Sequence, residues 1–205
     1  MTKTRSNGAF ASIGVDIGRD VMHIIGFDRN GSITLRKKIR RLSLENEFRK
    51  LPPSVVGLEA CQSAHFIRRM LRRLGHAPKI IPAMYVKPFC KGQKNDYNDA
   101  EAIAEAVLRP NLRAVPEKTQ DQLDLQALHR VRDRLVSRRT ATINQIRCFL
   151  LEHGIAVRPR THALRVSLEP ILMERADTIS PRMRDLLLDL QADWQRLDDR
   201  IEAVH

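Results

Sequence analysis

The first part of the chain carries the hydrophobic pattern of short strands. Residues 10–16 and 21–27 are mostly apolar runs, and residues 32–39 alternate between apolar and polar positions. The sequence Asp-Arg-Asn-Gly at 28–31 is a strong turn signal between the second and third of these segments. The pattern therefore predicts three successive strands joined by short turns, which form an antiparallel meander.

Helical and strand patterns alternate in the part of the chain that follows. Strands are expected over 54–59 and 79–82, a loop rich in Lys and Gly over 87–94, and helices over 43–51, 63–74 and 98–108. Ser43 is expected to cap the first of these helices. Three antiparallel strands followed by parallel strand–helix units are the order of a ribonuclease-H-like mixed sheet, so we expect an α/β fold over residues 9–112.

From residue 119 onward the strand pattern disappears. Helices are expected over 119–153, over 162–176 and from Ser180-Pro181 to the end of the sequence. The region 118–205 is therefore expected to be all-α, as a hairpin or coiled coil. The last helical pattern, which includes Trp194, continues to the final residues without a stop signal, so we expect a truncated chain. In the helix expected over 119–153, apolar residues recur at helical spacing and form a stripe along one side. These residues are Leu125, Leu128, Val131, Leu135, Ile143, Ile146 and Leu150.

Charge points to a polyanionic partner. The chain has 36 Lys and Arg against 24 Asp and Glu, a net charge of +12, and nucleic acid is the commonest partner of such a surface. Aromatic residues make up only 4% of the sequence, so binding is expected through backbone phosphates rather than through stacked bases. The cations expected to bind nucleic acid are Lys87, Lys91, Lys94, Arg130, Arg134, Arg138, Arg139 and Arg147.

Cysteine use and hydropathy indicate the compartment. Cys61, Cys90 and Cys148 are isolated in the sequence, which argues against a disulfide framework and against a structural zinc site. No apolar run approaches the about 20 residues that span a bilayer. Residues 1–8 are polar and basic with no hydrophobic segment behind them, so no signal peptide is expected. We expect a cytoplasmic protein with no membrane partner.

Four acidic residues occupy positions that suit a metal site. Asp16 ends the first predicted strand and Glu59 ends the fourth, so both are expected at the carboxyl edge of the sheet. Asp96 and Asp99 share one face of a helical first turn. Four crowded carboxylates repel one another, and two divalent ions about 3.5–4 Å apart relieve that repulsion and organise attack on a phosphodiester. The sequence thus predicts these four residues as catalytic ligands of Mg²⁺.

Structural explanations exist for each of these residues taken alone. Asp16 is more often a turn former than a catalyst in such a position, and Asp96 or Asp99 could cap the following helix. His23 lies on an apolar strand, where a packed or edge position is expected rather than a site. The combination of all four carboxylates in this order is harder to obtain from capping, and it favours the metal site.

Several motifs resemble those of the DEDD transposases of the insertion-sequence "one-ten" family, especially its "eleven-eleven" branch; the wider group includes the Piv DNA invertase. The resemblance covers roughly residues 13–155, and the Lys-Asn-Asp-x-x-Asp-Ala-Glu-Ala block is its most specific part. The motifs are Asp16-Ile-Gly18, Leu58-Glu-Ala-Cys-Gln-Ser-Ala-His65, Tyr85-Val-Lys-Pro-Phe89, Lys91-Gly-Gln-Lys-Asn-Asp-Tyr-Asn-Asp-Ala-Glu-Ala-Ile103 and Leu128-His-Arg-Val-Arg-Asp-Arg134.

The resemblance implies a RuvC-like nuclease domain whose acidic tetrad falls on Asp16, Glu59, Asp96 and Asp99. Two Mg²⁺ ions, with Mn²⁺ as a substitute, would bind there. It also implies site-specific recombination of DNA in the bacterial cytoplasm, near the nucleoid. A structured guide RNA would be a partner, and the helices would form dimers or tetramers.

Two departures from the family pattern limit what is carried over. Full-length members have a C-terminal domain with a nucleophilic serine, and no serine of this chain matches it, so we expect a chain that binds nucleic acid and metal without completing recombination. Cys61-Gln62 stands where the wider family often has Thr-Gly. Two alternatives stay open: a non-catalytic nucleic-acid-binding remnant or regulator that pairs with a full-length transposase, and a RuvC-like junction nuclease.

Overall fold

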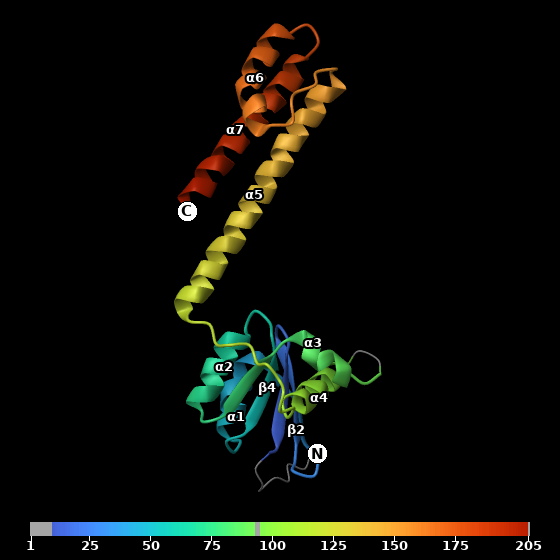
Figure 1. The fold of residues 1–205 in the computed structure, drawn as a ribbon, viewed down its shortest axis with the longest axis vertical. Coiled ribbons are helices and arrows are strands. Elements are labelled where there is room, and N and C mark those ends of the chain that lie inside the picture. The colour runs from blue at the N-terminus through green and yellow to red at the C-terminus, as the bar shows by residue number, and fades with distance from the viewer. Residues whose placement is uncertain (1–9, 93–94, 205) are drawn as a thin grey trace. The chain divides into compact units, whose positions relative to one another are not determined.

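The chain folds as two units, Met1–Lys118 and Thr119–His205 (Figure 1). The computed structural model describes residues 10–92 and 95–204. Lys94, which the sequence analysis predicted to bind nucleic acid, lies outside the described residues. Among the described helices, none combines the length and the apolar composition needed to cross a bilayer.

A mixed sheet forms the centre of the first unit. Its five strands, within the described residues, have the order β3-β2-β1-β4-β5. Strands β1 (Ser12–Ile17), β2 (Val21–Phe27) and β3 (Ile33–Arg40) form the antiparallel meander. Strands β4 (Val55–Glu59) and β5 (Ala77–Ile81) run parallel to β1. The predicted meander and ribonuclease-H-like mixed sheet are confirmed, and the first and fourth strands are neighbours.

Helices cover both faces of this sheet (Figure 1). On one face, Phe48 of α1 (Leu44–Arg49) and Leu71 of α2 (Ala64–Arg73) share a core with strand residues such as Ile13 and Leu58. On the other face, α4 (Asp96–Ala106) packs Ala100 and Ala104 against Ile25 and Phe27 of β2. Because successive residues of a strand point to opposite faces, strands buried on both sides have nearly continuous apolar sequences.

Small residues allow α4 to lie very close to the sheet. A Cβ on Gly14 would meet the backbone nitrogen of Ala104 at 2.4 Å, and one on Gly57 would meet Cγ2 of Ile103 at 2.8 Å. The Ser12 hydroxyl donates a hydrogen bond of 2.7 Å to the carbonyl oxygen of Ala104. Residues 12 and 14 of β1 therefore dock the helix, and residue 16, on the same face, lies below its N-terminal end.

The segment after β5 begins with a short helix, α3 (Ala83–Val86), over residues for which no element was predicted. The loop predicted over 87–94 begins with a 3₁₀ turn, η2 (Lys87–Phe89). Val86 is buried against Ile103 and Ile81 in a small core on the α4 side of the sheet. This tertiary packing, which sequence periodicity over so few residues does not show, holds the segment in helical form.

Two helix starts also differ from the prediction. Helix α4 begins at Asp96 rather than near residue 98, because the side chain of Asn95 accepts a hydrogen bond of 2.9 Å from the backbone N–H of Tyr97. Ser43 lies at the N-cap position of α1, as predicted, but its side chain makes no capping hydrogen bond, and the residue also ends a 3₁₀ turn, η1 (Arg41–Ser43).

The second unit is all-α, as predicted. It consists of α5 (Gln120–Glu152), α6 (Thr161–Glu174) and α7 (Pro181–Ala203). Thr119 and Gln122 form a capping box at the start of α5, and Ser180 caps α7 through the N–H of Met183. The core of this unit contains Ile146, Leu150, Leu164, Leu168, Leu187 and Trp194.

The apolar stripe of α5 is buried over only part of its length. Leu135, Ile143, Ile146 and Leu150 are buried, whereas Leu125 is 55% exposed, Leu128 50% and Val131 47%. The N-terminal part of the predicted stripe is thus an apolar face that the described part of this unit does not cover.

Candidate functional site

Strand register places Asp16, His23 and Glu59 on one face of the sheet. Asp16 of β1 lies directly opposite His23 of β2 in the antiparallel pair, and such residues share a face with Cβ atoms about 4.5–5.5 Å apart. Val15 pairs with Leu58 in the parallel β1–β4 ladder, so Glu59 follows beside Asp16. This face is the one covered by α4.

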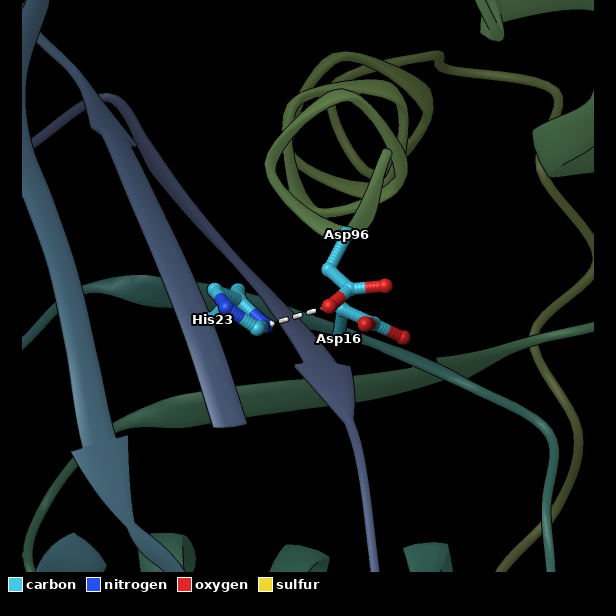
Figure 2. A group of neighbouring side chains, drawn as sticks. All are labelled: Asp16, His23 and Asp96. Atoms are coloured by element: carbon cyan, nitrogen blue, oxygen red, sulfur yellow. Dashed lines mark ion pairs between the residues drawn. The ribbon is translucent and has the colours of Figure 1, made fainter. Parts of the chain in front are cut away.

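Helix α4 brings the other two carboxylates to the same place. Its first residue is Asp96, and Asp99 follows three residues later, with its backbone N–H bonded to the Asn95 carbonyl oxygen at 2.9 Å. Figure 2 shows Asp96 above Asp16 and His23, at the point where β1 and β2 pass under the start of the helix. Neither aspartate is the N-cap, because Asn95 occupies that position.

Neighbouring carboxylates act on the pKa values of Asp16 and Glu59. The pKa of Asp16 is raised from 3.8 to about 6. Burial is the largest cause, and the negative charges of Asp99, Asp96 and Glu59 add to it, whereas His23 has an opposing effect. Burial and the charge of Asp99 also raise the pKa of Glu59, against a lowering effect of Lys87. Asp96, Asp99 and Glu59 thus all lie near Asp16: Asp16 and Asp96 have donor atoms within 4.8 Å of each other, and Glu59 and Asp99 line one cleft. Their mutual repulsion is what a divalent cation would relieve.

His23 is the residue whose place the sequence analysis missed. It is 6% exposed, which agrees with a packed position, but its Nδ1 lies 3.5 Å from Oδ2 of Asp96. One donor atom each from Asp16, His23 and Asp96 lie within 4.8 Å of one another. The signal in the sequence was the short turn between the first two strands, which fixes residues 16 and 23 as opposite neighbours.

A cleft of about 430 Å³ opens beside the carboxylates. Glu59 and Asp99 line it together with Lys87 and Lys91. Lys87 is exposed, whereas the Lys91 ammonium forms ion pairs with Glu101 at 3.0 Å and Glu105 at 3.6 Å. An anionic ligand in the cleft would thus meet an exposed cation at Lys87 and an already paired one at Lys91.

Strand β3 contributes two cations that the sequence analysis did not select. Lys38 pairs with His23 in the β2–β3 ladder, and Arg36 pairs with Ile25, so both belong to the α4 face. The Arg36 guanidinium carbon lies 4.2 Å from the ring centroid of Tyr97. The alternation of residues 32–39 placed these cations on one face, but it did not show that this face holds the carboxylates.

The predicted arginines of α5 fall into two groups. Arg130, Arg134 and Arg138 are exposed and lie at a spacing of four residues, along one side of the helix. Arg139 bonds Oδ1 of Asp198 on α7 at 3.2 Å, and Arg147 donates to the carbonyl oxygen of Pro159. The last two therefore have partners within the unit, which the sequence analysis did not foresee.

Comparison with known sequences gives a family match over residues 13–155, to the DEDD transposases of the IS110 type, described as a transposase. The chain is 42% identical over 193 residues to a "Probable family 20 transposase" of Pseudomonas aeruginosa. It is 40% identical over 192 residues to the transposase of IS1328 from Yersinia enterocolitica, and 36% over 199 residues to that of IS1111A from Coxiella burnetii. These alignments cover 94%, 94% and 97% of the chain but only 57%, 57% and 55% of the relatives.

Proposed function

Because the chain belongs to the IS110 family of DEDD transposases, we propose that the unit Met1–Lys118 is a metal-dependent nuclease unit for DNA. The observation that carries the proposal is the placement of carboxylates from β1, β4 and α4: Asp16 and Asp96 have donor atoms within 4.8 Å of each other, and Glu59 and Asp99 line the neighbouring cleft. The proposed catalytic ligands are Asp16, Glu59, Asp96 and Asp99.

The donor set fits Mg²⁺. Mg²⁺ prefers oxygen ligands and retains several waters, and the carboxylates here are half-buried or exposed, so that water and a phosphate can reach them. Mn²⁺ would substitute for it. Two such ions, when bound, would polarise the phosphodiester and lower the pKa of an attacking water or hydroxyl.

The chain's own residues position the ions and the DNA. Asp16 and Glu59 lie at the ends of hydrogen-bonded strands, so their oxygens are held by rigid backbone. Lys87 in the cleft and the β3 cations Arg36 and Lys38 would contact backbone phosphates on either side of the scissile bond. These contacts orient the strand without reading its bases.

Further partners are proposed for the second unit. The exposed row Arg130, Arg134 and Arg138 would bind phosphates of DNA or of the guide RNA that the family resemblance implies. The exposed apolar face at Leu125, Leu128 and Val131 would pack against a second copy of the chain in a dimer or tetramer.

The chain matches only part of the length of its relatives, so the proposal separates what these residues do from what the full-length protein does. The chain spans 57% of the length of the first two relatives. We propose metal binding, DNA binding and strand cleavage for the part of the transposase that this chain spans. Complete strand exchange is proposed for the full-length protein, with the nucleophilic serine that the family resemblance implies.

Strand cleavage tests this proposal. Supercoiled plasmid carrying an end of an insertion sequence would be incubated with the chain, with and without a full-length relative, in Mg²⁺ or EDTA. Nicking that needs Mg²⁺ and disappears in Glu59→Gln supports the proposal. Asp177→Asn, which changes an exposed carboxylate in the second unit, is the control and should nick normally. Equal nicking by Glu59→Gln and wild type would overturn the assignment.

A further inference from the structure

His23 is a buried nitrogen donor that faces the carboxylates of the proposed metal centre (Figure 2). Its side chain is 7% exposed, whereas that of its neighbour Asp96 is 63% exposed. A buried imidazole loses its hydration and needs a polar partner in exchange. The partner that Figure 2 draws for it is the carboxylate of Asp96, and a cation held by Asp16, His23 and Asp96 would be shared by all three side chains.

The distances in this group suit a bridging ion better than a direct pair. The Nδ1 of His23 lies 3.5 Å from Oδ2 of Asp96, longer than the about 2.7–2.9 Å of a charge-assisted hydrogen bond. Around an octahedral ion with bonds of about 2.1 Å, adjacent donor atoms lie about 3 Å apart and opposite ones about 4.2 Å apart. The donor atoms of Asp16, His23 and Asp96, all within 4.8 Å of one another, need only small side-chain adjustments to reach that arrangement.

The imidazole ring is held in place by its neighbours. The ring of Tyr97 packs edge to face against that of His23, with 4.7 Å between the ring centroids. The guanidinium group of Arg36, on β3, lies over the ring of Tyr97. Asp16 lies opposite His23 in the strand ladder. The nitrogen is therefore fixed by backbone register and by packing before any ion binds, as metal ligands commonly are.

We propose that Nδ1 of His23 is a ligand of the metal centre beside Asp16 and Asp96, and that this nitrogen raises the affinity of the centre for Mn²⁺ relative to Mg²⁺. Mg²⁺ is hard and favours oxygen, whereas imidazole nitrogen suits transition metals. Four carboxylates alone would discriminate little between the two ions. The inference rests on the proposed function only in requiring that the carboxylates hold a cation.

Mn²⁺ itself is the probe for this proposal. The full chain, freed of metal, would be titrated with Mn²⁺ and measured by electron paramagnetic resonance, with the electron spin echo analysed for coupling to ¹⁴N. We expect ¹⁴N coupling in the wild type and its loss in His23→Gln, with Mn²⁺ affinity lowered about tenfold or more. His129→Gln, at an exposed histidine of α5, should retain both.

An oxygen ligand at the same position separates ligation from mere support. In His23→Asp we expect Mn²⁺ to bind without ¹⁴N coupling, and competition with Mg²⁺ to show a lower preference for Mn²⁺ than in the wild type. Wild-type Mn²⁺ binding with no ¹⁴N coupling would overturn the inference and leave the proposed function standing. No saturable Mn²⁺ binding at all would overturn the proposed function. If His23→Gln fails to fold, as judged by its melting curve, the wild-type spectrum alone decides.

Discussion

Gly14 of β1 lies against Ala100 of α4, so closely that a Cβ on residue 14 would come within 2.0 Å of the Ala100 carbonyl oxygen. The atom it would strike belongs to the helix backbone, so no side-chain rotation relieves the clash. Because Asp96 and Asp99 lie on the first turn of the same helix, the contact sets the height of two proposed ligands above the sheet.

Gly14→Ala is expected to lift α4 and separate the carboxylates. We expect a loss of about 1–3 kcal/mol in the free energy of unfolding and a fall in Mn²⁺ affinity of about tenfold or more, measured by denaturant melts and by titration. Gly26→Ala is the matched control, because a Cβ there meets side chains of Leu35 and Phe10 instead. It should cost stability and leave metal affinity unchanged; equal losses of metal affinity in both variants would contradict the account.

The raised pKa of Asp16 makes stability depend on pH in the absence of metal. The group binds its proton more tightly in the folded state, with a pKa of about 6 against an ordinary 3.8. Its contribution to stability is therefore full below pH 3.8 and is lost as pH rises through about 6. In EDTA, Asp16→Asn should gain stability relative to wild type across this window.

Mg²⁺ should reverse that difference, because an ion that binds only the folded wild type stabilises it. Urea melts of wild type and Asp16→Asn at a series of pH values, in EDTA and in Mg²⁺, measure both effects. A difference in unfolding free energy that stays flat through pH 6 would show that Asp16 is not in the crowded, half-buried site described here.

The two groups of arginines on α5 should respond differently to substitution. Arg134→Gln is expected to weaken DNA binding and to lower the slope of log Kd against log salt concentration by about 0.9 for the lost phosphate contact. Arg139→Gln breaks the bond to Asp198 and should lower the melting temperature more than it changes the slope. Fluorescence anisotropy at several salt concentrations, with melting curves, separates these outcomes; identical slopes for Arg134→Gln and wild type would argue against the exposed row as a binding surface.

The exposed part of the α5 stripe should govern self-association. Leu128 is 50% exposed and Leu151, nearer the end of the same helix, is 63% exposed. We expect Leu128→Gln to shift the chain toward the monomer in light scattering, because it removes apolar area from the exposed apolar face proposed to bind a second copy. Leu151→Gln should leave the mass distribution of the wild type. A wild type that is monomeric at all concentrations would contradict the proposal that this exposed apolar face binds a second copy of the chain.

The sequence was informative where chemistry and strand order coincide. Asp16 and Glu59 could be predicted as neighbours because each ends an apolar strand and the order of strands fixes their pairing. Asp96 and Asp99 could be added because their spacing fits a helical first turn. All four are brought together in the structure, while their catalytic role stays a prediction.

Other features depended on register or on partners far along the chain. His23 could not be distinguished from a core histidine, because its role depends on which residue lies opposite it and on Tyr97 above it. In the sequence, Arg139 cannot be distinguished from the other arginines of α5, because its partner, Asp198, lies on a different helix. Val86 of the short helix α3 shares a small buried core with Ile103, a tertiary relation that no local pattern reveals.

The central claim is that four carboxylates from three elements form one divalent metal site, and Mn²⁺ titration of the full chain tests it most directly. At a pH above 6, where Asp16 is ionised, we expect saturable binding to the wild type and to Asp177→Asn. Binding should be abolished or strongly weakened in Asp99→Asn, with little change in the melting curve of the metal-free protein. Equal binding to wild type and Asp99→Asn would contradict the account.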